Sequence, residues 1–187
     1  MWSATKISAA SANKIQVEAG LLLNSFNPAS PTEPADTAII CATSGDFTIR
    51  AVPETQDFFE DVNNAANNTK EGKRITGWDC GLSVNALDID EDMLVMTLGA
   101  AEVSNGKVTP RAQYKLTDFG AIWWIGDMVD ETKLLCVKLI DAVSTGGFSL
   151  TTTKNGKGQM ALELTGHSSM ASPDVVPIEI YVLTKTV

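Results

Sequence analysis

Much of this chain alternates apolar and polar residues with a period of two, which is the period of a half-buried β-strand. Clear examples are residues 14–24, 74–86, 159–165 and 178–182. Residues 133–143 instead form a nearly continuous apolar run, which indicates a strand covered on both faces. Helical periodicity is scarce. The sequence therefore predicts a mainly β protein.

The chain has 187 residues, and folding a chain of this length buries roughly 70% of its extended surface. We expect a single domain over residues 1–187, with residues 1–13 as an N-terminal arm. The segment KNGKG, residues 154–158, predicts a hairpin turn because Asn155 and Gly156 readily adopt a positive φ.

One helix is expected at about residues 88–99, in the segment ALDIDEDMLVMTLGA. Asp88 can cap it, Glu91 completes a capping box, and Gly99 is a suitable stop. The alternative is a calcium loop, because acids stand at its first, third and fifth places. That interpretation is disfavoured, since Met93 stands where the loop needs Gly and Gly99 where it needs Glu.

Two long segments do not follow a regular pattern. Residues 26–36, FNPASPTEPAD, contain three prolines that remove ladder donors. Residues 54–73 are polar and rich in asparagine around the pair Phe58 and Phe59. Loops this long in a small domain are either disordered or ordered on a partner. We therefore take Phe26, Pro28 and Pro31 from the first loop, and the two phenylalanines of the second, as interface candidates.

The adjacent tryptophans Trp123 and Trp124 must point to opposite faces of a strand. One then enters the core, and the other either meets solvent and anchors an interface or is covered within the same subunit. The sequence leaves both alternatives open, so both tryptophans are interface candidates.

Residues suited to catalysis are few, and we expect neither an enzyme nor a cofactor or metal site. His167 is the single histidine and has no nucleophile pattern near it. Asp127 and Asp130 can be drawn as an acid pair for glycoside hydrolysis, but their segment is more simply a hairpin turn. The three cysteines are far apart within apolar stretches, which favours buried free thiols.

The formal net charge of −9 argues against a protein that grips nucleic acid, because such binding depends on Lys and Arg displacing counterions. The longest apolar runs are too short to span a membrane. We therefore expect a soluble protein with no membrane partner and no specific binding of DNA.

The order of the expected strands, loops and helix is similar to that of a known protein family. The chain reads EAGLLLNSF, a Pro-rich loop, SGDFTIRAVPETQDFFEDV, GKRITGWDCGLSV, the capped helix, IWWIGDM, LLCVKLIDAV, GGFSLTTTKNGKGQMALELTGHSS and PIEIYVL. Over most of residues 14–184 this layout resembles the tail tube (major tail) proteins of long-tailed bacteriophages. The phrases QVEAGLLL and ELTGHSSMASPDVVPIEIYVL and the acidic helix entry also look like that family.

The resemblance implies a β-sandwich or partial barrel with one flanking helix and long loops between rings, the tail-tube fold. Its subunits would form six-membered rings that stack into a homo-oligomeric tube within the virion tail, after assembly in the host cytoplasm. Tape-measure, tail-tip and tail-terminator proteins would be the other partners. DNA would pass through the tube without specific binding, and no catalytic residue is implied.

An acidic lumen suits such a passage, because like charges about 10 Å apart in water repel by only ~0.4 kcal/mol each. The lumen candidates are acids on the polar sides of expected strands: Glu18, Asp79, Glu163 and Glu179. The main alternative function is an immunoglobulin-like binding or capsid-decoration module, which an exposed tryptophan would favour.

Overall fold

The structure is a computed structural model that describes residues 6–186. Its α-helices are the single turn α1 (Ala9–Ala12) and the eight-residue α2 (Glu91–Leu98), and Asp36–Ala38 and Leu116–Asp118 form short 3-10 helices. The strands of this part of the chain are β1 (Leu21–Leu23), β2 (Thr43–Asp57), β3 (Lys73–Ala86), β4 (Ala101–Ser104), β5 (Lys107–Pro110), β6 (Gly120–Asp127), β7 (Lys133–Ser144), β8 (Leu150–Thr151), β9 (Gln159–Thr165) and β10 (Ile178–Thr184). The protein is mainly β, as predicted.

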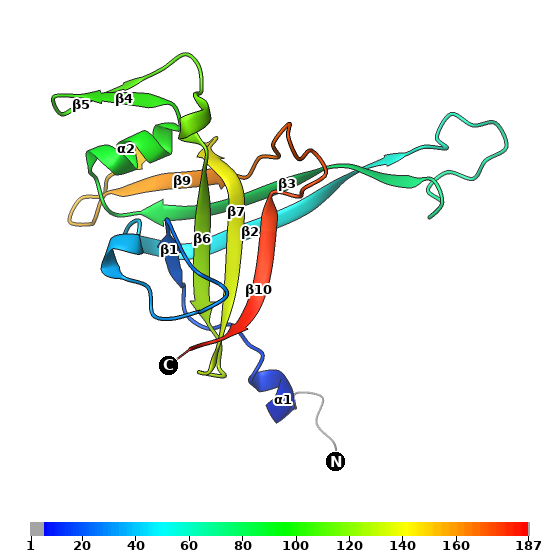
Figure 1. Cartoon of the computed structure of the whole chain (residues 1–187), viewed down its shortest axis with the longest axis horizontal. Coiled ribbons are helices and arrows are strands. Elements are labelled where there is room, and N and C mark those ends of the chain that lie inside the picture. The colour runs from blue at the N-terminus through cyan, green and yellow to red at the C-terminus, as the bar shows by residue number, and fades with distance from the viewer. Residues whose placement is uncertain (1–5, 187) are drawn as a thin grey trace.

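Eight of these strands form one antiparallel sheet in the order β1-β6-β7-β9-β3-β2, with β10 paired to β7 and β8 paired to β9. Strand β7 changes partners along its length: most of it pairs with β6 and β10, whereas Val143 and Ser144 pair with β9. The sheet therefore has two parts. We call β1, β6, β7 and β10 the first layer, and β2, β3, β8 and β9 the second layer. Their strands cross at a steep angle in Figure 1.

The main core lies between the two layers, and the strand patterns explain why. Cys80, Leu82 and Val84 alternate along β3 and are buried, as the period of two predicts. The other buried members come from both layers and from α2: Leu22, Cys41, Ala86, Met93, Ile122, Trp124, Val137, Leu139, Ala142, Met160, Leu162 and Leu164. The expected strands at 74–86, 133–143, 159–165 and 178–182 are all present.

The outer face of the first layer holds a second core. Leu23, Trp123, Leu134 and Cys136 are buried there, with Phe26 packed against them. This confirms that 133–143 is covered on both faces. The cover comes from the Pro-rich loop, which is tied down where Thr186 donates its N–H to the carbonyl oxygen of buried Pro31 at 2.7 Å.

The prediction of a long strand over residues 14–24 is wrong. Only β1 forms, together with an isolated bridge between Gln16 and Met128. The chain kinks at Glu18 and Gly20, whose φ angles are 63° and 84°. A Cβ at Gly20 would lie 2.3 Å from the carbonyl oxygen of Ile125, so the backbone approaches β6 too closely for any side chain.

Helix α2 begins later than expected. Its cap is Asp90, whose carboxylate accepts the N–H of Met93 at 2.8 Å, and Asp88 instead accepts the N–H of Ala42 at 3.0 Å. Gly99 ends the helix with a φ of 71°, as predicted. The helix packs on β7 and β9, and on the small β4–β5 hairpin.

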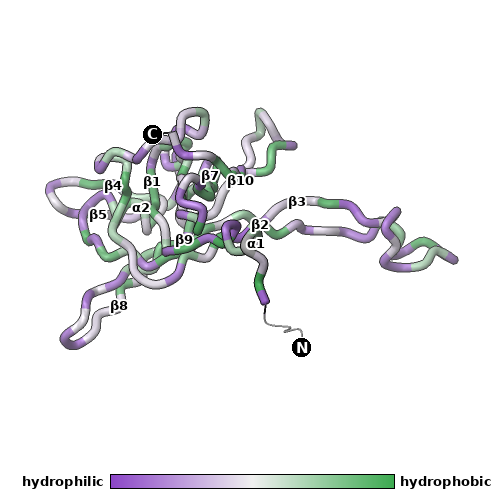
Figure 2. Tube along the Cα trace, turned by 90° about the horizontal axis from the view of Figure 1, so that it is seen from below, coloured by the Kyte–Doolittle hydropathy of each residue, from purple (hydrophilic) through white to green (hydrophobic). Residues whose placement is uncertain are grey.

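The hairpin formed by β2 and β3 extends far beyond the body of the protein, as Figures 1 and 2 show. We call residues 53–78 the arm. The expected loop at 54–73 is shorter than predicted, because residues 54–57 continue β2 and only 58–72 are irregular. The side chain of Asp57 holds the tip, accepting the N–H groups of Phe59 and Asn68.

Candidate assembly surfaces

The structure brings only two of the four lumen candidates together. Asp79 and Glu163 lie on the outer face of the second layer, where Arg50 bridges them: its Nε lies 2.9 Å from Asp79 and its Nη1 3.1 Å from Glu163. Glu179 lies on the outer face of the first layer, beside Lys138 at 3.5 Å. Glu18 lies in neither layer, in the kinked segment before β1. No single surface therefore holds all four acids.

Arg50 is a residue that the sequence reasoning missed. The hydrogen bonds that its guanidinium donates to Glu163 and Asp79 raise the pKa of Arg50, so the charge stays fixed on the layer's outer face. The alternation along β2 places Arg50 on the face opposite the core residues Ile49 and Ala51. This alternation is the sequence signal that indicates an outward-facing side chain for Arg50. The ion pairs of Arg50 join β2, β3 and β9, and no local sequence pattern predicts this pairing of three strands.

The interface candidates divide into buried and exposed residues. Trp123 and Trp124 are only 6% and 5% exposed, so both faces are covered within the chain and neither is an exposed anchor. Phe26 packs edge-on against Trp123, with ring centroids 5.8 Å apart. The Pro-rich loop thus covers the apolar outer face of the first layer in its own chain. Its residues Phe26, half-buried Pro28 and buried Pro31 belong to this cover.

The arm tip is the exposed part of the candidate set. Phe58 is 57% exposed and contacts the half-buried Phe59, with ring centroids 6.0 Å apart. The guanidinium of Arg74 lies 4.1 Å above the Phe58 ring, which makes a cation–π pair at the surface. Phe58 and Arg74 thus form an exposed aromatic and cationic pair at the end of the arm.

A groove of about 450 Å³ opens between the two layers, and we call it the mouth groove. Its lining is mostly apolar and includes the acidic residues Glu18 and Asp46. The other lining residues come from both layers and from the segment before β1: Gln16, Ala19, Phe47, Ile49, Trp124, Leu135, Val137 and Ile180. Next to it, Ile180 and Val182 of β10 are 60% and 63% exposed. Strand β10 therefore turns an apolar face to solvent where the second layer does not reach.

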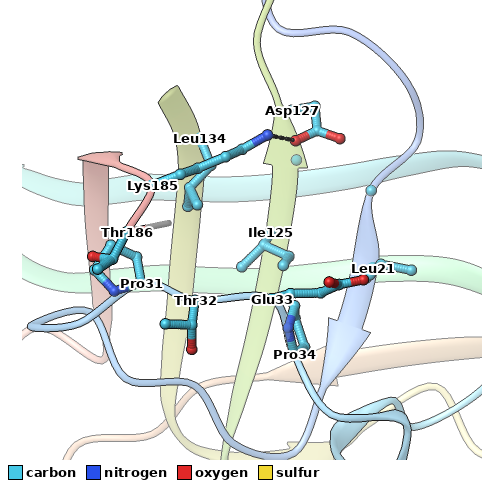
Figure 3. Close-up of a pocket in the computed structure, with 12 residues that line it drawn as sticks. Leu21, Pro31, Thr32, Glu33, Pro34, Ile125, Asp127, Leu134, Lys185 and Thr186 are labelled. Carbon is cyan, nitrogen blue, oxygen red and sulfur yellow. Dashed lines mark hydrogen bonds and ion pairs between the residues drawn. The ribbon is translucent and has the colours of Figure 1, made fainter. Parts of the chain in front are cut away.

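Figure 3 shows a second groove, of about 470 Å³, between the Pro-rich loop and β6. Leu21, Ile125 and Leu134 give it an apolar floor. Lys185 and Asp127 close one end through an ion pair of 2.7 Å. The groove holds a lysine and two carboxylates but no histidine, cysteine or serine, so its chemistry is that of a surface crevice.

The acid pair considered for glycoside hydrolysis is not arranged for proton transfer. Asp127 is paired with Lys185, whereas the hydroxyl of Thr132 donates to Asp130 and lowers the pKa of that carboxyl. A general acid needs a raised pKa instead. The Nδ1 of His167 donates to the carbonyl oxygen of Asp141 at 3.2 Å, away from both acids.

The three cysteines are free and buried. Burial raises the pKa of Cys41 to about 11 and that of Cys136 to about 12, and it also raises the pKa of Cys80. At neutral pH these thiols stay protonated and are poor nucleophiles. Within residues 6–186, no three His, Cys, Asp or Glu side chains gather closely enough to hold a metal ion.

None of the helices in the described part of the chain has the length and apolar character to cross a membrane. In comparisons with known proteins, no family model matches the chain. No curated protein matches it significantly in sequence either.

Proposed function

We propose that this chain is the structural subunit of a bacteriophage tail tube, in which six-membered rings stack into a hollow tube that guides DNA into the host. The observation that carries the proposal is the arm, a long two-stranded projection with an exposed aromatic tip. An isolated two-stranded hairpin is marginally stable in water. A projecting hairpin of this kind gains stability when a neighbouring copy covers it.

The two crossed layers with α2 at one side fit the β-sandwich of the tail-tube fold. In that arrangement the arm spans from one ring to the next. The small β4–β5 hairpin and the Pro-rich loop belong to the body of each subunit. Tape-measure, tail-tip and tail-terminator proteins are then the other partners in the virion tail, and assembly takes place in the host cytoplasm.

The outer face of the second layer is the surface that we assign to the lumen. It carries Asp79 and Glu163, and its charge is moderated by Arg50 between them. The outer face of the first layer is unsuited, because the Pro-rich loop covers it and Glu179 there is paired with Lys138. A face with mixed charge and a net negative sign repels DNA weakly and offers no run of cations to bind phosphates.

The alternative, a binding or decoration module, loses its main support in this structure. It depended on an exposed tryptophan, and both Trp123 and Trp124 are buried. The pair of acids that an enzyme would need is split between separate partners. The tube subunit remains the function that the geometry supports best.

Negative-stain electron microscopy of the concentrated full-length protein tests the proposal. We expect rings or hollow tubes from the natural chain. A matched variant, in which a two-residue turn replaces residues 58–72, should give a folded monomer that forms neither. A uniform field of small particles from the natural chain, also after addition of a purified tail-tip complex, would contradict the proposal.

A further inference from the structure

The two layers are joined through β7, at a bend in that strand. Strand β7 pairs with β10 up to Leu139 and with β9 from Val143 onward. Between these two residues Asp141 has a φ of 45°, in the left-handed region that a residue with a Cβ rarely adopts inside a strand. Strands that pass from one crossed sheet to another do so at bends of this kind. We call residues 140–142 the corner.

His167, the single histidine of the chain, binds the corner from the second layer. It follows shortly after β9 ends at Thr165. Its backbone N–H donates to the carbonyl oxygen of Ile140 at 3.1 Å, and its Nδ1 donates to the carbonyl oxygen of Asp141 at 3.2 Å. The ring of Phe119 packs edge-on against the imidazole, with centroids 5.3 Å apart. One residue thus holds two consecutive carbonyl groups of the corner.

Gly166 ties the same segment to the neighbouring strands. Its N–H donates to the carbonyl oxygen of Cys80 in β3 at 2.9 Å. A Cβ at Gly166 would lie 2.7 Å from the carbonyl oxygen of Pro177 and 3.2 Å from that of Ile140, so no side chain fits there. The N–H of Ile140 in turn donates to the carbonyl oxygen of Pro177 at 3.0 Å. Residues 166–167 therefore lie where β3, β7 and the start of β10 converge.

These bonds compensate for the strain at Asp141. A non-glycine residue at positive φ costs free energy and persists only where its surroundings hold it. The carboxylate of Asp141 forms no ion pair within residues 6–186, so its own charge does not hold the corner. The contact also selects a tautomer of His167, because a carbonyl oxygen only accepts and Nδ1 must carry the hydrogen. In water, neutral imidazole prefers its hydrogen on Nε2.

We propose that the corner is a strained hinge and that His167 is its latch. While the latch is closed, Asp141 stays at positive φ and the end of β7 stays paired with β9. When the latch opens, Asp141 returns to an extended conformation, and Val143 and Ser144 separate from β9 while the first layer stays intact. The device belongs to the fold of a single subunit and is independent of the proposed function.

The tautomer of His167 is the first test. Nitrogen NMR of the natural chain at about pH 8, above the ordinary titration range of imidazole, distinguishes the two ring nitrogens, and a single histidine leaves no ambiguity of assignment. We expect the hydrogen on Nδ1. A hydrogen on Nε2 would overturn the latch, because Nδ1 would then have nothing to donate to Asp141.

Hydrogen exchange of backbone amides under native conditions measures the opening. The amides of Thr145, Gly166 and His167 bond across the junction of the layers, to Glu163, Cys80 and Ile140 respectively. We expect these three amides to exchange together, before those paired between β7 and β10.

Two substitutions of the latch residue test its part in that opening. His167→Leu removes the imidazole donor and keeps a side chain of similar bulk, so it should speed exchange at the junction about fivefold, as for the loss of one ordinary hydrogen bond. His167→Asn, whose amide nitrogen can take the place of Nδ1, should restore most of the protection. An unchanged rate in the leucine variant would overturn the latch.

Relief of strain at Asp141 tests the hinge itself. Glycine adopts a positive φ without steric cost, so Asp141→Gly added to His167→Leu should return exchange at the junction to near the natural rate. Asp141→Ala is the matched control, because it also removes the carboxylate but keeps a Cβ, and it should restore nothing. Glycine at an unstrained strand position would loosen the strand instead. Equal exchange for the two double variants, when circular dichroism shows that both are folded, would overturn the hinge.

Discussion

Replacing Phe26 by alanine should destabilise the free subunit, although Phe26 lies in a Pro-rich loop. Its ring packs edge-on against Trp123, at 5.8 Å between centroids and 61° between planes, and it covers a cluster that includes Leu134 and Cys136. Fully buried Phe→Ala changes cost about 3–5 kcal/mol. Phe26 is half-buried, so we expect roughly 2 kcal/mol, of which the aromatic pair contributes ~1 kcal/mol.

Urea unfolding followed by far-ultraviolet circular dichroism measures this cost on the monomer. The matched control is Phe58→Ala, a 57% exposed loop phenylalanine whose ring pairs with Phe59 and Arg74. The control should change the free energy of unfolding by less than about 0.5 kcal/mol, as surface substitutions usually do, and it should abolish assembly. Equal costs for the two variants would refute the assignment of one loop to the body and the other to the interface.

Three further changes test the positions of single residues. Arg50→Gln should lower the free energy of unfolding by about 1–2 kcal/mol in urea, because two half-exposed carboxylates lose their shared partner; no change would mean that solvent already screens the bridge. Gly20→Ala should cost at least about 2 kcal/mol, since the φ of 84° and the carbonyl at 2.3 Å both resist a Cβ, and near-normal stability would contradict that close approach. Asp118→Asn should make stability less dependent on acid: hydrogen bonds from the N–H of Lys115 and the guanidinium of Arg111 lower the pKa of Asp118, so its contribution is fully present above the ordinary carboxyl pKa and is lost as pH falls from there through the lowered pKa of the folded state. Parallel unfolding curves for the natural chain and the variant at about pH 6 and about pH 3 check this, and an unchanged difference in stability would contradict it.

The secondary structure followed from the sequence wherever the signal was local. The alternation over 159–165 matches β9, the alternation over 178–182 falls within β10, and Asn155 takes a φ of 63° in the turn between β8 and β9. The prediction of a strand from this pattern failed at residues 14–24, where the same alternation of apolar and polar residues is present. There the kink at Glu18 and Gly20 breaks the strand, because the chain must pass close to β6.

The candidate site was less accessible from the sequence, because it depends on which faces are covered. The period of two shows that Trp123 and Trp124 point to opposite faces, and it cannot show that residues 26–36 cover one of those faces. Similarly, the acidic run before α2 predicts a cap, whereas the choice of Asp90 over Asp88 depends on the distant N–H of Ala42.

The sequence by itself determined the β class, the main strands, the position of one helix and the absence of a recognisable catalytic motif. These properties depend on neighbours within a few residues. The tertiary structure decided which acids share a surface, that a loop expected to await a partner covers its own subunit, and that the arm leaves the body. Those outcomes depend on contacts between residues far apart in sequence, such as Arg50 with Glu163 across 113 positions, and no local pattern encodes the register that joins them.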